Sequence, residues 1–403
     1  MAGSWSRSTG KPNGDQSAMT SAKRGLILCR MRTCLRAVLA GLVLAATLAV
    51  GAAGQERAAT PARTPQPAFG DPTNIYANNP YAPPREDGEI HPEHVRGQAW
   101  VLTGEPGGAN VVVQFGDQGV LVVDTGTRAM SQKLLALIER LAAEHGGEHR
   151  EIRRVINTSG RLDHVGGNET IAKAGSQIIS GEERAQQVAF VSPGAEVIAH
   201  ENVLRRFGAG GDEFRGLEPT DPESFEVDNQ RFNGEAVQIH HYNANTDAQL
   251  VVLFRGADVI VAGDVLDMVT YPIIDTKAGG TIDGELAALN KVIGMASPGP
   301  QAEGGTMIVP GHGRAVDQAE AALYRNGLTI IRNTVQYYKN QGKTLQQVLD
   351  LKPSEGYDQR WGGAGGSWTT RDFITAVYET LPAKGQVFFS IQTTTTGPGG
   401  KKF

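Results

Sequence analysis

A short apolar segment that runs directly into a glycine-bearing polar loop constrains this chain more than any other feature. Residues 152–158 have the composition of a strand, and the loop Ser-Gly-Arg-Leu-Asp-His-Val-Gly-Gly follows at 159–167. Two more apolar segments end in the same way, at Asp264 in Ala-Gly-Asp and at His312 in Pro-Gly-His-Gly. Such strand ends carry polar side chains in glycine-lined loops. The pattern therefore predicts a β-rich protein whose Asp and His side chains gather where strands end.

Strand and helix patterns alternate through residues 94–320. Residues 111–115 and 120–124 flank the turn Gly-Asp-Gln-Gly and predict a hairpin, and residues 131–143 have helical apolar spacing. Further strands are predicted at 100–103, 236–241, 250–254, 259–262 and 306–309, and further helices at 282–293 and 317–340. Because helices separate the strand clusters, we expect an α/β (α+β) fold of two mixed sheets packed face to face with helices outside, a four-layer αββα sandwich.

The two ends of the chain are predicted to lie outside this domain. Arg30, Arg32 and Arg36 precede an apolar run at 37–50 and small residues at 51–54, the layout of a secretory signal peptide. We interpret residues 1–54 as this signal peptide with an over-long N-terminal extension. A membrane anchor is the alternative, but the apolar segment at 37–50 is short for a transmembrane helix. Residues 55–93 are interpreted as a partly disordered linker, 321–390 as a helical extension packed on the main domain, and 391–403 as a flexible tail.

Charge and cysteine content narrow the partners. The whole chain has a formal net charge of −5, and residues 1–54 hold seven of its 38 basic but one of its 43 acidic residues. The exported chain is therefore more acidic still, which argues against binding to nucleic acid or to an anionic membrane. Cys29 and Cys34 both lie in the leader, so no disulfide and no thiolate metal ligand remain. We expect a periplasmic or secreted protein with no lasting membrane insertion and leave its oligomeric state open.

Two carboxylates and two imidazoles stand at the predicted strand ends. A strand-end Asp alone is usually a turn residue, and a single His is usually structural. Together, Asp163, His164, Asp264 and His312 offer enough donors for one divalent ion with a water still attached. This donor set favours Zn²⁺, with Fe²⁺ and Mn²⁺ as the alternatives.

Over residues 94–315 the chain resembles the metallo-β-lactamase superfamily in motifs and in their order. The first motif of that family is Thr-His-x-His-x-Asp-His-x-Gly-Gly. Thr158, Asp163, His164 and the glycines at 166 and 167 match it. Asp264 matches the metal-bridging aspartate of the family, His312 its last histidine, and Asp124 a strand-end aspartate that supports the site from behind. The resemblance implies that Asp163, His164, Asp264 and His312 form the second metal site of the family.

The departures from the family pattern all fall on its first metal site. Ser159 and Arg161 stand in place of the first two histidines, and Asn245 stands in place of the third. One divalent ion with the Arg161 guanidinium would bring Asp163 and Asp264 to a net charge of about +1, whereas a second ion beside Arg161 would overcharge the site. The sequence therefore predicts one ion, with the guanidinium in place of the other.

These residues predict an exported hydrolase with a single ion, acting on a small ester, lactone, thioester, amide or phosphoester. The ion would activate water, and Asp163 or Asp264 would take up the proton. Arg161 with Asn245 would hold a carbonyl or phosphoryl oxygen, supported from behind by Ser159 and Asp124. Because the first ion of a two-metal enzyme does much of the polarising, the alternative is an inactive relative that binds a small anion or a protein.

Four other side chains carry smaller predictions. His200 is expected to have a structural role at the start of a helix; a place at the mouth of the pocket is the alternative. His240 and His241 are consecutive on a strand and should face opposite sides of it. Tyr271 is equally compatible with a substrate wall and with core packing.

Overall fold

A computed structural model describes residues 88–104, 107–177, 194–299, 304–362 and 367–385, all within the compact unit Tyr76–Phe403. The predicted leader, nearly all of the linker and the tail at 391–403 lie outside these residues, so export stays a prediction. Within the described ranges, no helix combines the length and the apolar character that crossing a membrane requires.

A seven-stranded sheet is built from the N-terminal half of the domain. Its strands lie in chain order: β1 His91–Arg96, β2 Ala99–Thr103, β3 Val111–Gly116, β4 Gly119–Val123, β5 Ile152–Ile156, β6 Glu196–His200 and β7 Asp221–Glu223. Strands β1 to β4 pair antiparallel, with the predicted hairpin at β3 and β4, and β4 to β7 pair parallel. Strand β1 starts at His91, three residues before the predicted start of the domain at residue 94.

A five-stranded sheet follows, with the order β12-β11-β10-β9-β8. The bounds are β8 Val227–Phe232, β9 Glu235–Tyr242, β10 Gln249–Phe254, β11 Val259–Asp267 and β12 Met307–His312. Only β11 and β12 pair parallel among these strands of the described chain. The predicted site residue Asp264 lies near the end of β11, and His312 ends β12. Each sheet thus has neighbouring parallel strands whose carboxyl ends lie at the same edge.

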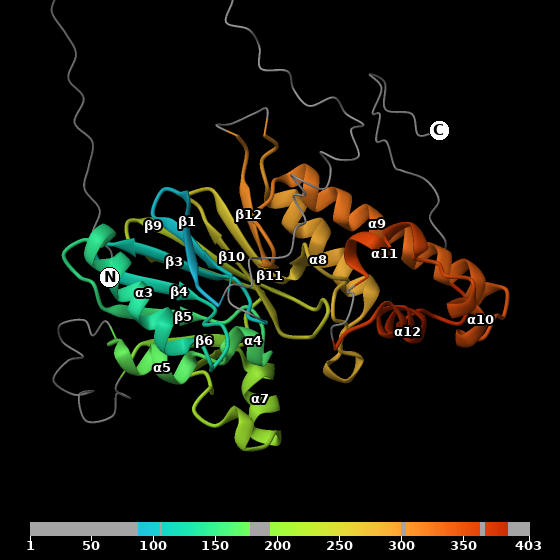
Figure 1. Cartoon of the computed structure of the whole chain (residues 1–403), viewed down its shortest axis with the longest axis horizontal. Coiled ribbons are helices and arrows are strands. Elements are labelled where there is room, and N and C mark those ends of the chain that lie inside the picture. The colour runs from blue at the N-terminus through green and yellow to red at the C-terminus, as the bar shows by residue number, and fades with distance from the viewer. Residues whose placement is uncertain (1–87, 105–106, 178–193, 300–303, 363–366, 386–403) are drawn as a thin grey trace, which may run out of the picture. The chain divides into compact units, whose positions relative to one another are not determined.

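Helices cover both outer faces of the paired sheets. Leu121 and Ile156 of the first sheet share a buried cluster with Val252 and Val261 of the second, which places one core between the sheets. Helices α3 (Ser131–His145) and α5 (Asn168–Ala174) pack on the first sheet, and α8 (Ile282–Met295) and α9 (Gln318–Asn340) pack on the second (Figure 1). The predicted four-layer αββα sandwich is confirmed. The shorter elements are α4 Leu162–Val165, α7 Glu201–Ala209, η1 Asp212–Phe214 and η2 Thr276–Ala278.

A helical extension completes the C-terminal half, as predicted. It contains α10 Leu345–Asp350, α11 Glu355–Trp361 and α12 Thr370–Thr380. Trp361 and Phe373 of this extension are buried in the same cluster as Leu328 of α9 and Ile260 of β11. Since α9 packs directly on the second sheet, the predicted boundary at residue 320 falls inside a helix of the fourth layer.

Candidate metal centre

Asp124 joins the ends of the two central strands of the first sheet. It follows β4 with a φ of 61°, a left-handed conformation that Asp adopts more readily than most residues. Its carboxylate accepts hydrogen bonds from the backbone N (2.8 Å) and from Oγ1 (2.5 Å) of Thr158, directly after β5. Gly263 brings the second sheet against the same threonine, because a Cβ there would lie 2.5 Å from Thr158 Oγ1. The strand ends of both sheets therefore meet at one point.

His164 is fully buried between two carboxylates. Its Nδ1 lies 2.8 Å from Asp124 Oδ2 and its Nε2 lies 2.9 Å from Asp264 Oδ1. Burial acts to lower the pKa of the imidazole, but Asp264 and Asp124 together raise this pKa well above its usual value. Because Asp124 orients the ring through Nδ1, Nε2 is the nitrogen that points into the centre.

His312, at the end of β12, faces two other carboxylates. Its Nε2 lies 3.3 Å from Asp163 Oδ2, and its Nδ1 lies 3.3 Å from Asp267 Oδ2. Burial opposes protonation, but Asp163 and Asp267 raise the pKa of His312 to about 10. Asp267, which stands at the end of β11, was not predicted from the sequence. The available signal was a second Asp three residues after Asp264.

The Arg161 guanidinium lies between the two carboxylates that it was predicted to balance. Its Nε and Nη2 donate to the two oxygens of Asp163 at 3.1 and 2.8 Å, and Nε lies 3.5 Å from Asp264 Oδ2. Burial acts to raise the pKa of Asp163, but His312, His164 and Arg161 hold it well below its usual value. His164 and Arg161 do the same for the buried Asp264. Both carboxylates are therefore ionised.

Polar packing fills the side of the centre where histidines are replaced. The Gln249 amide nitrogen lies 3.1 Å from Thr246 Oγ1 and 3.5 Å from Ser159 Oγ, and all three residues are buried. Asn245 is buried too, and its Nδ2 donates to the backbone oxygen of Asp264 at 3.2 Å. Arg161 lines an open cleft that Asn245 does not reach, so the structure does not bring these two residues together as the predicted oxygen-binding pair.

The residues present fit one divalent ion. One donor atom each from Asp163, His164 and His312 lies within 4.8 Å of the other two. A tetrahedral ion with bonds of about 2.1 Å needs donors roughly 3.4 Å apart, so small side-chain shifts would suffice. Asp264 Oδ2 is buried and accepts no hydrogen bond from the described residues, which leaves it available as a fourth donor. All these donors are nitrogen or oxygen atoms, a set that suits Zn²⁺, Fe²⁺ or Mn²⁺.

One more carboxyl group lies close behind the centre. Glu285, on α8, is fully buried, and neither of its oxygens has a hydrogen-bond partner among the described residues. Burial, and then the charges of Asp264 and Asp267, raise its pKa well above the usual value. We therefore infer a neutral acid at this position. In the sequence it is one acidic residue in an amphipathic helix, with nothing to mark it.

The remaining side chains with predictions have structural roles. His200 Nδ1 accepts a hydrogen bond from Asn202 N at the start of α7, which confirms its place at a helix entry. His241 stacks on the His200 ring, with centroids 3.8 Å apart, whereas His240 stacks with Tyr242, two positions along the strand. Tyr271 is buried, stacks on Phe373 and donates to Asp358, which is core packing.

An αββα sandwich with Asp and His side chains at the strand ends is the arrangement of a hydrolase-like protein with a candidate metal site. Residues 104–312 match the model of the metallo-beta-lactamase superfamily. The chain belongs to that superfamily. No curated protein sequence matches it.

Three solved structures are similar to this chain. A double mutant of the sec-alkyl sulfatase PisA1 is 16% identical with a TM-score of 0.50, over 72% of this chain and 50% of that one. A metallo-beta-lactamase from Pontibacter korlensis is 15% identical with a TM-score of 0.42, over 60% of this chain and 99% of that one. The metallo-beta-lactamase DIM-1 is 12% identical with a TM-score of 0.41, over 59% and 96%. At such identities the alkylsulfatase likeness supports the fold alone.

Proposed function

We propose that this chain is an exported hydrolase that uses one divalent ion, held by Asp163, His164, Asp264 and His312. The observation that carries the proposal is the convergence of donors from both sheets, together with a buried Asp264 Oδ2 that accepts no hydrogen bond from the described residues. An ion bound there would supply Lewis acidity, which lowers the pKa of water and polarises a substrate oxygen. Zn²⁺ is favoured, with Fe²⁺ and Mn²⁺ as alternatives.

The surrounding residues have distinct tasks in this proposal. Asp124 and Asp267 orient the two imidazoles by their contacts with the ring nitrogens. Asp163, at the edge of the cleft, takes up the proton of the attacking water. Arg161 lines the same cleft, and its Nη1 has no partner among the described residues, so it can donate to a carbonyl or phosphoryl oxygen. The substrate class is a small ester, lactone, thioester, amide or phosphoester.

A second candidate function follows from the bidentate contact between Arg161 and Asp163. Since this contact engages both oxygens of a proposed ligand, it favours an inactive relative that binds a small anion or a partner protein without an ion. In the hydrolase, Asp163 would bind the ion in place of the Arg161 guanidinium. In the inactive relative, Asp163 would stay paired with Arg161.

Metal analysis of the purified protein separates the candidates. We expect about one ion per chain after exposure to Zn²⁺, Fe²⁺ or Mn²⁺ and dialysis, and loss of that ion in Asp163→Asn. Asp258→Asn is the matched control, because Asp258 accepts from Thr306 and pairs with Arg96 outside the centre. No retained ion with any of the three metals would refute the proposal. A retained ion without turnover of any of the five substrate classes would favour the binding module.

A further inference from the structure

Arg161 and Asp163 open onto a cleft of about 870 Å³. Three walls surround it: the motif loop at 161–166, the segment 127–129 that follows Asp124, and the loop that contains residues 212, 213 and 217. Its volume is within the range of small-molecule sites. A substrate of the centre would therefore have its reacting group at Arg161 and Asp163 and the rest of its body between these walls.

The cleft beside the reacting end is apolar. Leu162 stands between Arg161 and Asp163 in the chain, and the residue is 42% exposed, unlike most leucines of the described residues. Ala129, which is exposed, adds apolar surface to the second wall, whereas Leu217 is buried beneath the third. An exposed leucine next to a reactive centre is a surface that an apolar group can cover.

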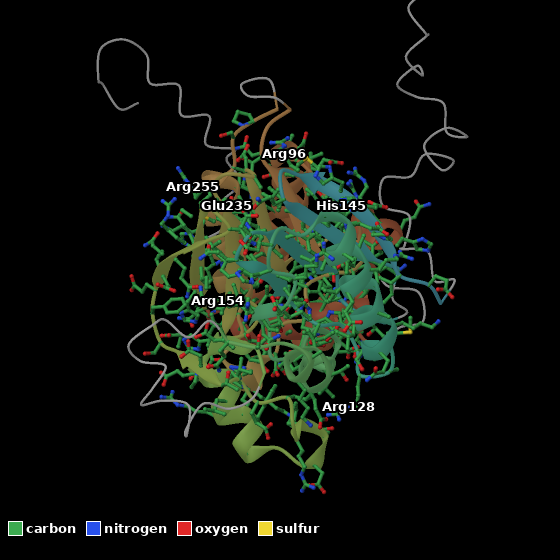
Figure 2. The ribbon with its side chains drawn as sticks, turned by 90° about the vertical axis from the view of Figure 1, so that its left-hand side faces the viewer. Arg96, Arg128, His145, Arg154, Glu235 and Arg255 are labelled. Carbon is green, nitrogen blue, oxygen red and sulfur yellow. The ribbon has the colours of Figure 1, made fainter. Side chains whose placement is uncertain are left out.

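Arg128 holds one wall rather than offering a second cation to a ligand. Its Nη1 pairs with Glu169 at 3.3 Å, and its Nη2 donates to the backbone oxygens of Glu213 and Arg215 at 3.4 and 3.2 Å. Figure 2 shows Arg128 at the end of the domain opposite Arg96 and Arg255, so those arginines are remote from the cleft. The wall that Arg128 holds also carries the carboxylates of Asp212 and Glu213. A ligand thus meets Nη1 of Arg161, whose Nε and Nη2 contact Asp163, and acidic groups on the loop wall.

We propose that this cleft selects substrates with an uncharged, medium-length acyl chain, placed along Leu162 with the carbonyl at Arg161. The proposal rests on the proposed function and narrows its substrate class to esters or lactones of such acids. Acids that carry a second carboxylate at the far end are disfavoured, because Asp212 and Glu213 repel it. Leu162 is the specificity-determining residue.

Binding of the product acids tests this without requiring turnover. Straight-chain carboxylates from acetate to octanoate are titrated into the protein by calorimetry with Zn²⁺ present. Full burial of a methylene strengthens binding about fourfold, so contact with one wall of an open cleft should strengthen it about twofold per carbon. Hexanoate should bind several-fold more tightly than adipate, and Asp212→Asn with Glu213→Gln should remove that difference.

Leu162→Ser should flatten the chain-length dependence and leave acetate binding and metal content unchanged. Leu323→Ser, at a leucine that is 53% exposed on α9, is the matched control and should keep the dependence. Equal affinity for acetate and octanoate in the unmodified protein, or an unaltered slope in Leu162→Ser, would overturn the inference. Chain-length-dependent binding without any hydrolysis would support the cleft and refute the hydrolase, so the two failures are distinguishable.

Discussion

Arg161→Gln should have opposite effects on the metal-free and the metal-bound protein. Without an ion, the substitution removes two charge-assisted hydrogen bonds to Asp163 and the nearby pairing with Asp264. A hydrogen bond to a charged group contributes about 1.5–3 kcal/mol, and because the Arg161 side chain is 30% exposed we take about 2 kcal/mol for the loss. For a domain of about 300 residues, whose entropy of unfolding is about 0.6 kcal/mol/K, that loss lowers Tm by roughly 3 °C.

With the ion bound, the same substitution removes a repulsion. Arg161 Nη2 lies 2.8 Å from Asp163 Oδ2, so an ion on that oxygen would lie within about 5 Å of the guanidinium. A unit charge and a double charge at about 5 Å repel by about 1.7 kcal/mol even in water, and by more in a half-buried site. Arg161→Gln should therefore bind Zn²⁺ at least about tenfold more tightly than the unmodified protein.

Calorimetric unfolding in EDTA measures the first effect, and a Zn²⁺ titration measures the second. The matched control is Arg154→Gln, because the Arg154 side chain is 25% exposed and pairs with Glu196 at 2.8 Å, outside the centre. The control should lower the free energy of unfolding without altering metal affinity. If Arg161→Gln bound Zn²⁺ no more tightly than the unmodified protein, the view of the guanidinium as a substitute for an ion would be refuted.

Three further variants test the groups in and around the centre. The pKa of Glu285 is raised in the folded protein, so this carboxyl stays neutral there while it ionises near pH 4.5 in the unfolded chain. The free energy of unfolding therefore falls as pH rises above that value. The Tm of Glu285→Gln should rise relative to that of the unmodified protein between pH 4 and 8, and a constant difference in Tm would contradict this. Burial lowers the pKa of His200 to about 4, so its contribution to stability is present above about pH 6.5 and is lost as pH falls toward 4. His200→Asn keeps a side chain that can cap α7. Urea unfolding at pH 7 and at pH 5 should show a smaller fall in the free energy of unfolding for this variant than for the unmodified protein. The third variant restores the three missing histidines and removes the neighbouring glutamine: Ser159→His, Arg161→His, Asn245→His and Gln249→Ala. It should bind two ions per chain and increase ester or lactone turnover. The triple histidine variant that retains Gln249 should stay near one ion per chain, because Gln249 packs at Ser159.

The fold could be predicted because its periodic signals are local. The β3–β4 turn, the strand ends and the amphipathic helices each lie within a few neighbouring residues, and the family motifs located Asp163, His164, Asp264 and His312. The error at residue 320 arose because the apolar spacing of α9 shows that one face is buried but not what it packs on. Only the packing of the sheets shows that Leu328 and Tyr324 complete the fourth layer.

The polar neighbours of the centre could not be predicted in this way. Asp267 was missed because the predicted strand ended at residue 262, whereas β11 continues through Gly263 to Asp267 and presents a second carboxylate to His312. Gln249 and Glu285 approach the site from β10 and α8, and their positions depend on how the second sheet packs against the first and against its own helices. No local pattern in the sequence contains that information.

These additional carboxylates change the predicted charge balance of the centre. With one divalent ion, Arg161, Asp163 and Asp264 alone, the net charge of the centre is about +1. Asp124 and Asp267, which each contact an imidazole, add two negative charges. Without an ion, protonated His164 and His312 join Arg161 to oppose four carboxylates with three positive charges. With one divalent ion and neutral imidazoles, the ion and Arg161 again supply three. One ion can therefore replace two protons at constant net charge, whereas a second ion would need Arg161 to leave and the packing of Gln249 against Ser159 to open. Because the net charge of the centre is the same with and without one ion, the replacement of the first-site histidines by Ser159, Arg161 and Asn245 is compatible with an intact second site.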